Sequence, residues 1–230
     1  MNGSDANQSE HVEKPEQPRE ADKVPVGISI LWPVLKVGRS LKKMVDSYNE
    51  YFNVSPSDLK EIYLRKSQLA EERGDYSNSV FFMEKAAALD PGDRESLYLL
   101  GVAYEKNKDL EDAMDTYKKV IESQPDHVKA YYRIGFICLR KREFEEAIAA
   151  FEKALTLEPG SADILFRLGQ AYDRLQKHER AVSLFSRAVE IDGEHLPSYK
   201  NMALAYDSLN KHKEALACLK RALELEEMLA

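Results

Sequence analysis

The sequence predicts an all-α fold, a right-handed superhelical array of helix-turn-helix repeats. Two observations support this prediction. Gly101, Gly135 and Gly169 stand 34 residues apart, and Ala203 follows after the same interval. Other residues keep the same spacing: Ala113, Ala147, Ala181 and Ala215; Tyr117, Phe151, Phe185 and Leu219; and Pro91, Pro125 and Pro159. A fixed period of this length indicates a solenoid in which each unit packs only on its neighbours.

Five consecutive units follow from this period. They cover residues 60–93, 94–127, 128–161, 162–195 and 196–229, and the first is the weakest match. Each unit resembles the tetratricopeptide-repeat family, whose members pair two antiparallel helices in 34 residues. We call the nth residue of a unit its place n. The resemblance covers about three quarters of the chain and implies a non-enzymatic protein that binds other proteins.

The spacing within a unit has a packing explanation. We expect the small residue at place eight, such as Gly135, to face the alanine at place twenty, such as Ala147, so that the two helices approach closely. The alanines at place 27, for example Ala154, let the second helix receive the next unit. Proline then ends the unit, because it cannot continue a helix.

The N-terminal part differs in composition from the repeats. Residues 1–23 are mostly polar and acidic, and we predict a disordered tail. Residues 24–58 are predicted to form an apolar N-terminal helix, or a degenerate repeat damaged by Gly27 and Pro33. Three roles are open for this segment: it caps the first repeat, it contacts lipid peripherally, or it inserts into a neighbouring molecule. Its candidate self-assembly residues are Trp32, Val34, Val37, Leu41, Met44, Val45, Tyr48 and Phe52.

Charge and cysteine content exclude several classes of protein. The formal net charge of −7 without a concentrated basic run argues against a nucleic-acid binder. Two cysteines inside helical patterns suit a reducing compartment. The acidic start lacks the order of a secretory signal, so we expect a cytoplasmic protein.

Catalytic and metal-binding patterns do not emerge from the sequence. We find no catalytic motif and expect neither an enzyme nor a cofactor or metal. His178 and His212 occupy place seventeen, where other units have Tyr76, Leu110 and Phe144, so we interpret them as packing residues. Cys138 replaces a tyrosine of other units and is interpreted as core filler.

The family resemblance also implies a binding groove. In tetratricopeptide proteins, places 2, 5, 6, 9, 12 and 13 of the first helices line the concave face. The candidate partner-binding residues are Tyr98, Lys129, Tyr132, Arg133, Phe136, Arg140, Phe166, Arg167, Gln170, Arg174, Lys200 and Asn201. Aromatic and cationic side chains together favour an acidic or amphipathic peptide. The alternative is local ion pairing, for instance between Arg167 and Asp163.

One known variety of groove does not fit this chain. Chaperone-tail clamps use lysine and asparagine at places five and nine of one unit, asparagine at place six of the next, and lysine and arginine at places two and six of the third. Lys129 and Arg133 match the last pair, but Leu64, Gln68 and Leu99 occupy the other positions. A chaperone C-terminal clamp is therefore not predicted.

The segment before the regular repeats carries a closer resemblance. The stretch from Lys43-Met44-Val45-Asp46 through Phe52-Asn53-Val54 into Tyr63-Leu64-Arg65-Lys66 is similar to the MamA family of magnetosome-associated proteins. The resemblance implies a homo-oligomer on the cytoplasmic face of the magnetosome membrane that recruits other magnetosome proteins. It also implies docking of the N-terminal helix into the groove of a neighbour. The alternative function is a monomeric adaptor or co-chaperone-like peptide binder.

Overall fold

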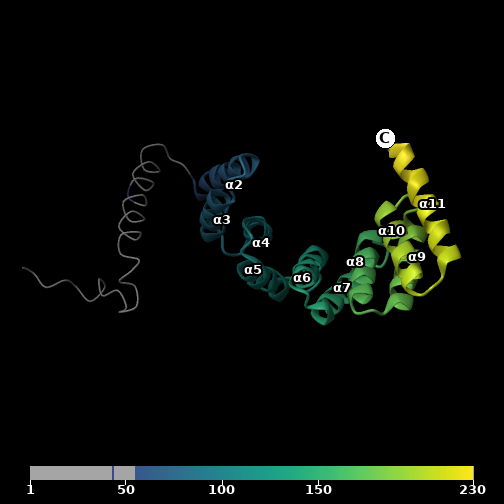
Figure 1. Cartoon of the computed structure of the whole chain (residues 1–230). Helices are drawn as coiled ribbons and strands as arrows, with labels where there is room; N and C mark the ends of the chain where they lie inside the picture. Colours follow the sequence, from purple (N-terminus) through teal and green to yellow (C-terminus); the bar gives the residue numbers. More distant parts are fainter. Residues whose placement is uncertain (1–42, 44–54, 230) are drawn as a thin grey trace, which may run out of the picture. The chain divides into compact units, whose positions relative to one another are not determined.

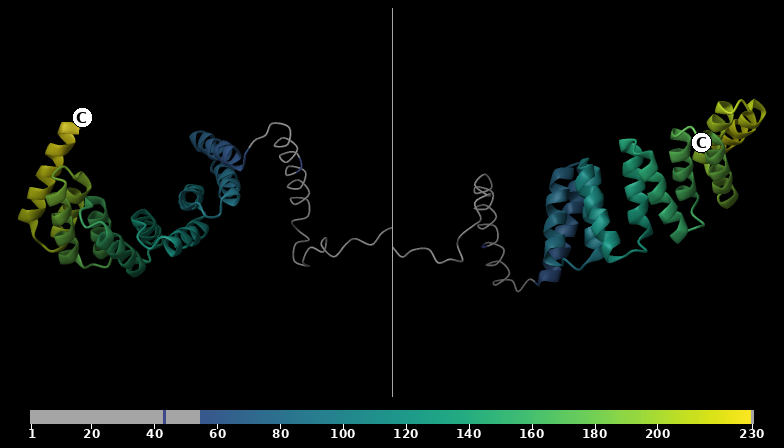
Figure 2. Two further views of the ribbon diagram at one scale, coloured as in Figure 1. Left: turned by 180° about the vertical axis from the view of Figure 1, so that it is seen from behind. Right: turned by 90° about the horizontal axis from the view of Figure 1, so that it is seen from below.

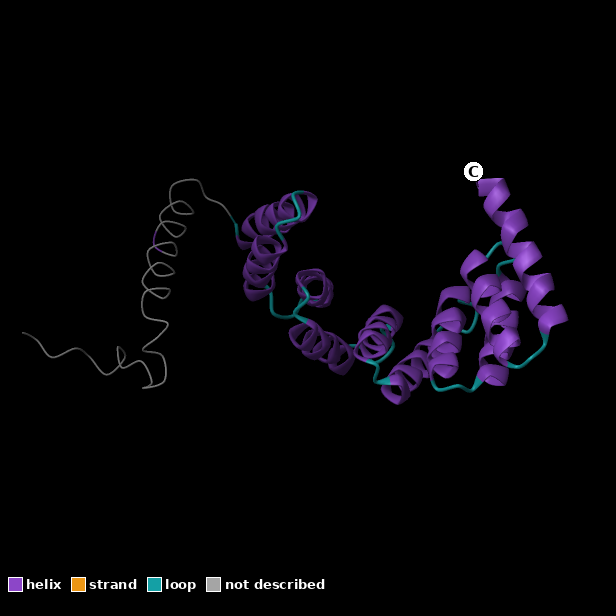
Figure 3. Cartoon of the chain, in the orientation of Figure 1, coloured by secondary structure: helices purple, strands orange, loops and turns teal. Residues whose placement is uncertain are grey.

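The computed structural model describes Lys43 and residues 55–229 of the chain. In this described part every element of regular secondary structure is a helix (Figure 3). The predicted tail at 1–23 and nearly all of the predicted N-terminal helix lie outside the described residues. All eight candidate self-assembly residues lie outside the described residues as well.

Ten described helices pair into five antiparallel hairpins. They are α2 (Pro56–Glu72) with α3 (Tyr76–Leu89), α4 (Arg94–Asn107) with α5 (Leu110–Ser123), α6 (Val128–Lys141) with α7 (Phe144–Leu157), α8 (Ala162–Arg174) with α9 (His178–Ile191), and α10 (Leu196–Ser208) with α11 (His212–Leu229). Each helix contacts the next one along the chain. Within residues 55–229 the first helices lie on the inner side of the curve and the second helices outside (Figures 1 and 2). The all-α, α–α superhelical fold class is therefore confirmed.

The first hairpin begins earlier than its unit. Ser55 accepts a hydrogen bond from the Asp58 backbone amide, and the Asp58 carboxylate accepts one from the Ser55 amide. This reciprocal capping box, with Pro56 in the first turn, starts α2 at Pro56. Residues 56–58, predicted to end the degenerate N-terminal segment, therefore belong to α2.

The turns inside and between hairpins follow two local rules. At place fifteen the chain adopts a left-handed conformation in all five hairpins, at Gly74, Lys108, Arg142, Gln176 and Asn210. Only the first of these is glycine, the residue that adopts this conformation without steric cost. Second helices of the first three hairpins end two residues before proline, because the residue preceding proline disfavours the helical conformation.

The helices of a hairpin approach closely at place eight, where the nearest neighbour is an aromatic ring of the second helix. A β-carbon at residue 135 would lie 2.8 Å from Cε1 of Phe151, and the same conflict joins Gly101 to Tyr117 and Gly169 to Phe185. Place eight therefore faces the aromatic ring at place 24, whereas its contact with the alanine at place twenty stays a prediction. The ring occupies the space that glycine leaves, because a methyl group at place eight would overlap it.

A charged contact ties the first two hairpins together. Asp93 caps α4 by accepting hydrogen bonds from the backbone amides of Glu95 and Ser96, and it lies 2.6 Å from the Lys60 ammonium on α2. Lys60 also lies 3.3 Å from Asp90. The Lys60 hydrogen bond, followed by that of the Ser96 hydroxyl, lowers the pKa of Asp93 to about 2.

We expect Asp93→Ala to lower the free energy of unfolding by about 1–2 kcal/mol at pH 6, after allowance for solvent screening. Because the folded pKa is depressed, this contribution is complete above pH ~4, near the pKa of an unfolded aspartate, and disappears as the pH falls towards 2. Urea unfolding followed by circular dichroism at several pH values measures it. Asp90→Ala is the matched control, since Asp90 shares Lys60 but is 55% exposed against 24% for Asp93, and should cost less. An Asp93→Ala deficit that does not shrink in acid contradicts this account.

Candidate binding surface on the first helices

Two of the predicted groove aromatics are buried inside the array. Tyr98 on α4 and Phe166 on α8 are both buried. The Tyr98 ring packs 5.7 Å from that of Tyr117, and Phe166 packs 5.9 Å from Phe185. The prediction that these two side chains anchor a partner is therefore corrected, because the aromatic residue at place 24 of the same hairpin already occupies their faces.

Histidine from the start of the next hairpin covers the same rings. His127 lies 5.0 Å from Tyr98, and His195 lies 5.3 Å from Phe166. Each histidine also caps its helix, α6 or α10, by accepting a backbone hydrogen bond at Nδ1. The equivalent place 34 holds Ser161 in the third unit, so no imidazole covers Tyr132. Tyr132 is consequently only half-buried.

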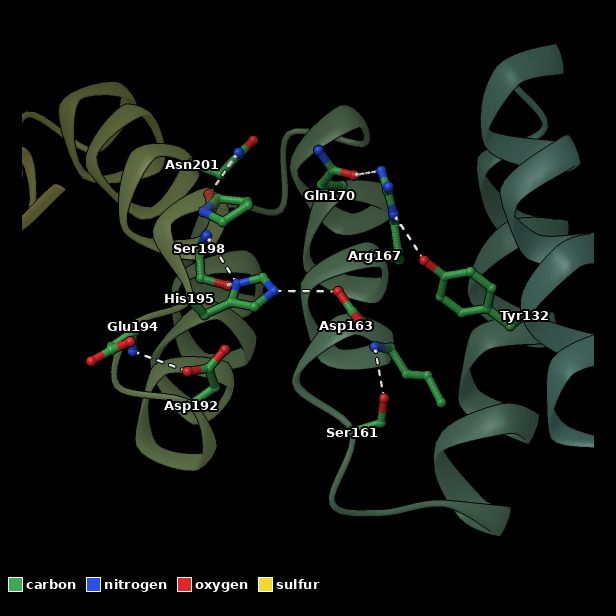
Figure 4. Close-up of polar contacts among 12 residues, drawn as sticks. Tyr132, Ser161, Asp163, Arg167, Gln170, Asp192, Glu194, His195, Ser198 and Asn201 are labelled. Atoms are coloured by element: carbon green, nitrogen blue, oxygen red, sulfur yellow. Dashed lines mark hydrogen bonds and ion pairs between the residues drawn. The ribbon is translucent and has the colours of Figure 1, made fainter. Parts of the chain in front are cut away.

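Arg167 is held by several contacts across two hairpins (Figure 4). Its Nε donates to the Tyr132 hydroxyl at 3.3 Å and its Nη1 donates to Oε1 of Gln170 at 3.0 Å. The guanidinium also lies 5.0 Å from the centre of the Phe136 ring. Asp163 lies instead near His195, 3.4 Å from Nε2, so the predicted pairing of Arg167 with Asp163 is wrong.

Arg133 also has a partner within the array. Its Nη1 lies 3.4 and 3.5 Å from the two carboxylate oxygens of Glu105, and the Tyr117 hydroxyl donates to that carboxylate at 3.1 Å. Burial, followed by the charge of Glu105, raises the pKa of the Tyr117 hydroxyl. Glu105 is only 9% exposed, so this network joins α4, α5 and α6 through a buried charge.

A cationic hollow lies at the C-terminal ends of α6 and α8. It measures about 350 Å³, and the arginines Arg140, Arg142, Arg167 and Arg174 line it together with Phe136, Leu139, Phe144 and Gln170. No acidic side chain lines it. Among residues 55–229, no ion pair or hydrogen bond occupies the side chains of Arg140, Arg142 or Arg174. We call this feature the arginine hollow.

Arg142 was missing from the sequence-based set. It stands at the left-handed turn position between α6 and α7, where the first hairpin has Gly74. The sequence did contain a signal for Arg142. The left-handed turn conformation favours glycine, so an arginine there does not stabilise the turn and is available for another role. The nearby acid, Glu143, forms an ion pair with Lys141, with 2.9 Å between Oε1 and Nζ, and does not neutralise the arginines.

The remaining groove candidates differ in whether they already have a partner within the chain. Lys129 is exposed and lines a second hollow of about 380 Å³ with Tyr98, Tyr132, Arg133 and Asp163. Lys200 forms an ion pair with Glu226 on α11, and the Asn201 side chain donates to the Pro197 carbonyl at 2.9 Å. Lys200 and Asn201 thus contact their own hairpin, whereas the arginine hollow keeps its charge available.

Of the two histidines at place seventeen, His212 does not have the predicted packing role. His178 and His212 begin α9 and α11, and each Nδ1 lies within 2.9 Å of an aspartate five residues earlier, Asp173 or Asp207. His212 is 71% exposed, so interpreting it as a packing residue is wrong. At the first residue of a second helix, the ring reaches back across the turn to the preceding acid. The described residues contain no cluster suited to a metal ion.

Neither Cys138 nor the described helices point to a reactive thiol or a membrane span. Cys138 is buried as predicted, and burial raises the pKa of its thiol to about 11, which keeps it protonated. Of the helices described, none is sufficiently long and apolar to cross a membrane.

Stacked helical hairpins with a 34-residue period define the class of tetratricopeptide-repeat proteins. The family model described as "Anaphase-promoting complex, cyclosome, subunit 3" matches residues 72–154 and 140–222. These matches together span more than half of the chain, which therefore belongs to the helical-repeat family that this model describes. Its repeat fold is generally that of a non-enzymatic protein-interaction scaffold.

Solved structures of MamA resemble the chain over most of its length. One, described as the crystal structure of MamA protein, has a TM-score of 0.66 and 27% identity, and covers 74% of this chain and 93% of that one. Another, MamA 41-end from Desulfovibrio magneticus RS-1, has a TM-score of 0.69 and 25% identity over 76% of this chain and 98% of that one. The predicted resemblance to MamA is confirmed.

A curated relative matches a shorter segment. The "Photosystem I assembly protein Ycf3" of Prochlorococcus marinus (strain NATL1A) is 37% identical over 79 residues, which is 31% of this chain. The match covers 46% of the relative, so the chain spans less than half of that protein's length. This similarity supports the repeat class.

Proposed function

We propose that this chain is a self-assembling scaffold that coats the cytoplasmic face of the magnetosome membrane and recruits other magnetosome proteins. The MamA resemblance supports the setting, and the arginine hollow is the observation that carries the proposal. Arg140, Arg142 and Arg174 leave several positive charges without an acidic partner among the described residues, in a chain whose net charge is −7. Such a surface favours an acidic or amphipathic segment from another protein or another copy.

Self-assembly uses two parts of the chain in this proposal. The apolar segment at 24–52 supplies a helix that needs a surface to bury against, and the inner face of the first helices supplies the cationic contacts. Groove residues that remain accessible are Lys129, Tyr132, Phe136, Arg140 and Arg174, with Arg142 added. The alternative, a monomeric adaptor, uses the same inner face without the N-terminal segment.

The test reverses two charges of the hollow in the full-length protein. We expect the double variant Arg140→Glu and Arg174→Glu to sediment as smaller species than the wild type and to capture fewer proteins from cell extract. Raising salt should weaken the wild type in the same direction, because charge contacts at an exposed surface are screened within about 10 Å at 0.1 M salt. Deleting 24–52 should give a monomer that keeps the helical circular dichroism of the repeats.

The matched control reverses two exposed cations on second helices, Lys153→Glu and Arg187→Glu, which change the net charge equally. This control should assemble and capture proteins like the wild type. Wild-type protein that sediments as a 26.3 kDa monomer supports the adaptor instead. If the hollow variant assembles and captures the same proteins as the control, the arginine hollow has no binding role.

A further inference from the structure

The arginine hollow and the N-terminal segment proposed for self-assembly have the same sign of charge. Residues 24–52 contain four basic residues, Lys36, Arg39, Lys42 and Lys43, against two acidic ones, Asp46 and Glu50. Placing the basic stretch at 36–43 against Arg140, Arg142 and Arg174 would bring like charges together, which is unfavourable. The basic stretch therefore favours a different part of the inner face, and the hollow suits a more acidic occupant.

The hollow is suited to carboxylates. Guanidinium groups bind carboxylates through paired hydrogen bonds, and Phe136 and Phe144 add apolar walls. Arg167 is fixed through Tyr132 and Gln170, and because its Nη1 bonds the Gln170 Oε1, the amide nitrogen of Gln170 stays available as a donor. The hollow is open rather than enclosed, so an extended segment carrying several acids fits better than one small ion.

We propose that the arginine hollow binds the acidic segment at residues 5–22 of a second copy of this chain. That segment carries the six acids Asp5, Glu10, Glu13, Glu16, Glu20 and Asp22 against the two bases Lys14 and Arg19. It is thus complementary in charge to the hollow, whereas the basic stretch that follows it is not. This inference rests on the self-assembly in the proposed function.

The proposal gives the two N-terminal segments separate tasks. The apolar segment at 24–52 supplies buried contact area, and the acidic segment supplies charge contacts to the hollow of the same neighbour. Linking two weak contacts in one chain raises the affinity without strengthening either one. The charge contacts also select the orientation, because the reverse placement opposes basic residues to arginines.

Zero-length cross-linking between mixed chains tests this contact. The variant Arg140→Lys with Arg174→Lys keeps the charge of the hollow and introduces amines that a carbodiimide joins to touching carboxylates. Isotopically heavy and light forms of the full-length variant are mixed, assembled and cross-linked, and the linked peptides are identified by mass spectrometry. We expect heavy-to-light links between acids of residues 5–22 and the introduced amines, about tenfold more frequent than in a control variant, Arg187→Lys on α9.

Each result decides the question. Links found only within heavy or only within light chains, or links from acids elsewhere, overturn the proposal. A second variant removes five of the six acidic charges of the segment through Glu10→Gln, Glu13→Gln, Glu16→Gln, Glu20→Gln and Asp22→Asn, and should assemble with a weaker dependence on salt. An unchanged salt dependence also overturns it. Assemblies that form without these links refute this contact alone, whereas wild-type protein that never assembles refutes the proposed function.

Discussion

Replacing Phe151 by alanine is expected to lower the free energy of unfolding by about 3–5 kcal/mol, the largest effect of any substitution considered. The ring is fully buried, and its Cε1 would lie only 2.8 Å from a β-carbon at residue 135. It also packs edge-on against Tyr132, with the ring centres 5.7 Å apart. Its removal leaves a cavity between α6 and α7 that glycine at position 135 cannot fill.

Chemical denaturation followed by circular dichroism measures this loss, and hydrogen exchange locates it. In a repeat array each unit contacts only its neighbours, so the reduced protection should concentrate in α6, α7 and α8. Adding Gly135→Ala should recover part of the loss in the Phe151→Ala background, because the new methyl group enters the cavity, but should destabilise the wild type by overpacking. If Gly135→Ala has the same effect in both backgrounds, the two positions are not in contact.

Replacing Arg133 by alanine is expected to cost about 2–3 kcal/mol, the second largest effect. The substitution leaves the carboxylate of Glu105, 9% exposed, without its cationic partner between α4, α5 and α6. The value lies below that of a fully buried pair, because the Arg133 side chain is 36% exposed. The contact of α5 with α6 is less extensive than that of other consecutive helices, so this pair contributes to the junction between the second and third hairpins.

A double-mutant cycle separates the pair from a binding role for Arg133. Glu105→Gln combined with Arg133→Ala should be more stable than Arg133→Ala alone, since the unpaired buried charge is removed. The exposed pair of Lys118 and Asp115 is the control, and Lys118→Ala should cost no more than ~1 kcal/mol. Equal losses in the two backgrounds would show that Glu105 does not depend on Arg133.

The groove illustrates where sequence-based prediction stops. Place within the repeat identified Arg133, Arg140, Arg167 and Arg174 as neighbours on successive first helices, and the described structure puts all four on the inner side. The position of a residue within its repeat unit does not show which of these arginines already has a partner. Glu105, which pairs with Arg133, is 28 residues distant, and Tyr132, which pairs with Arg167, is 35 residues distant.

The 34-residue period alone determined that the chain forms stacked helical hairpins, because small residues, aromatic residues and prolines recur at positions that only this packing explains. The tertiary structure decided which side chains remain available to a partner. Tyr98 and Phe166 became core because His127 and His195 from the next hairpin close over them, whereas Ser161 leaves Tyr132 half-open. Arg140, Arg142 and Arg174 keep their charge because no acid of the described neighbouring helices reaches them, and such an absence depends on distances between hairpins that local sequence does not encode.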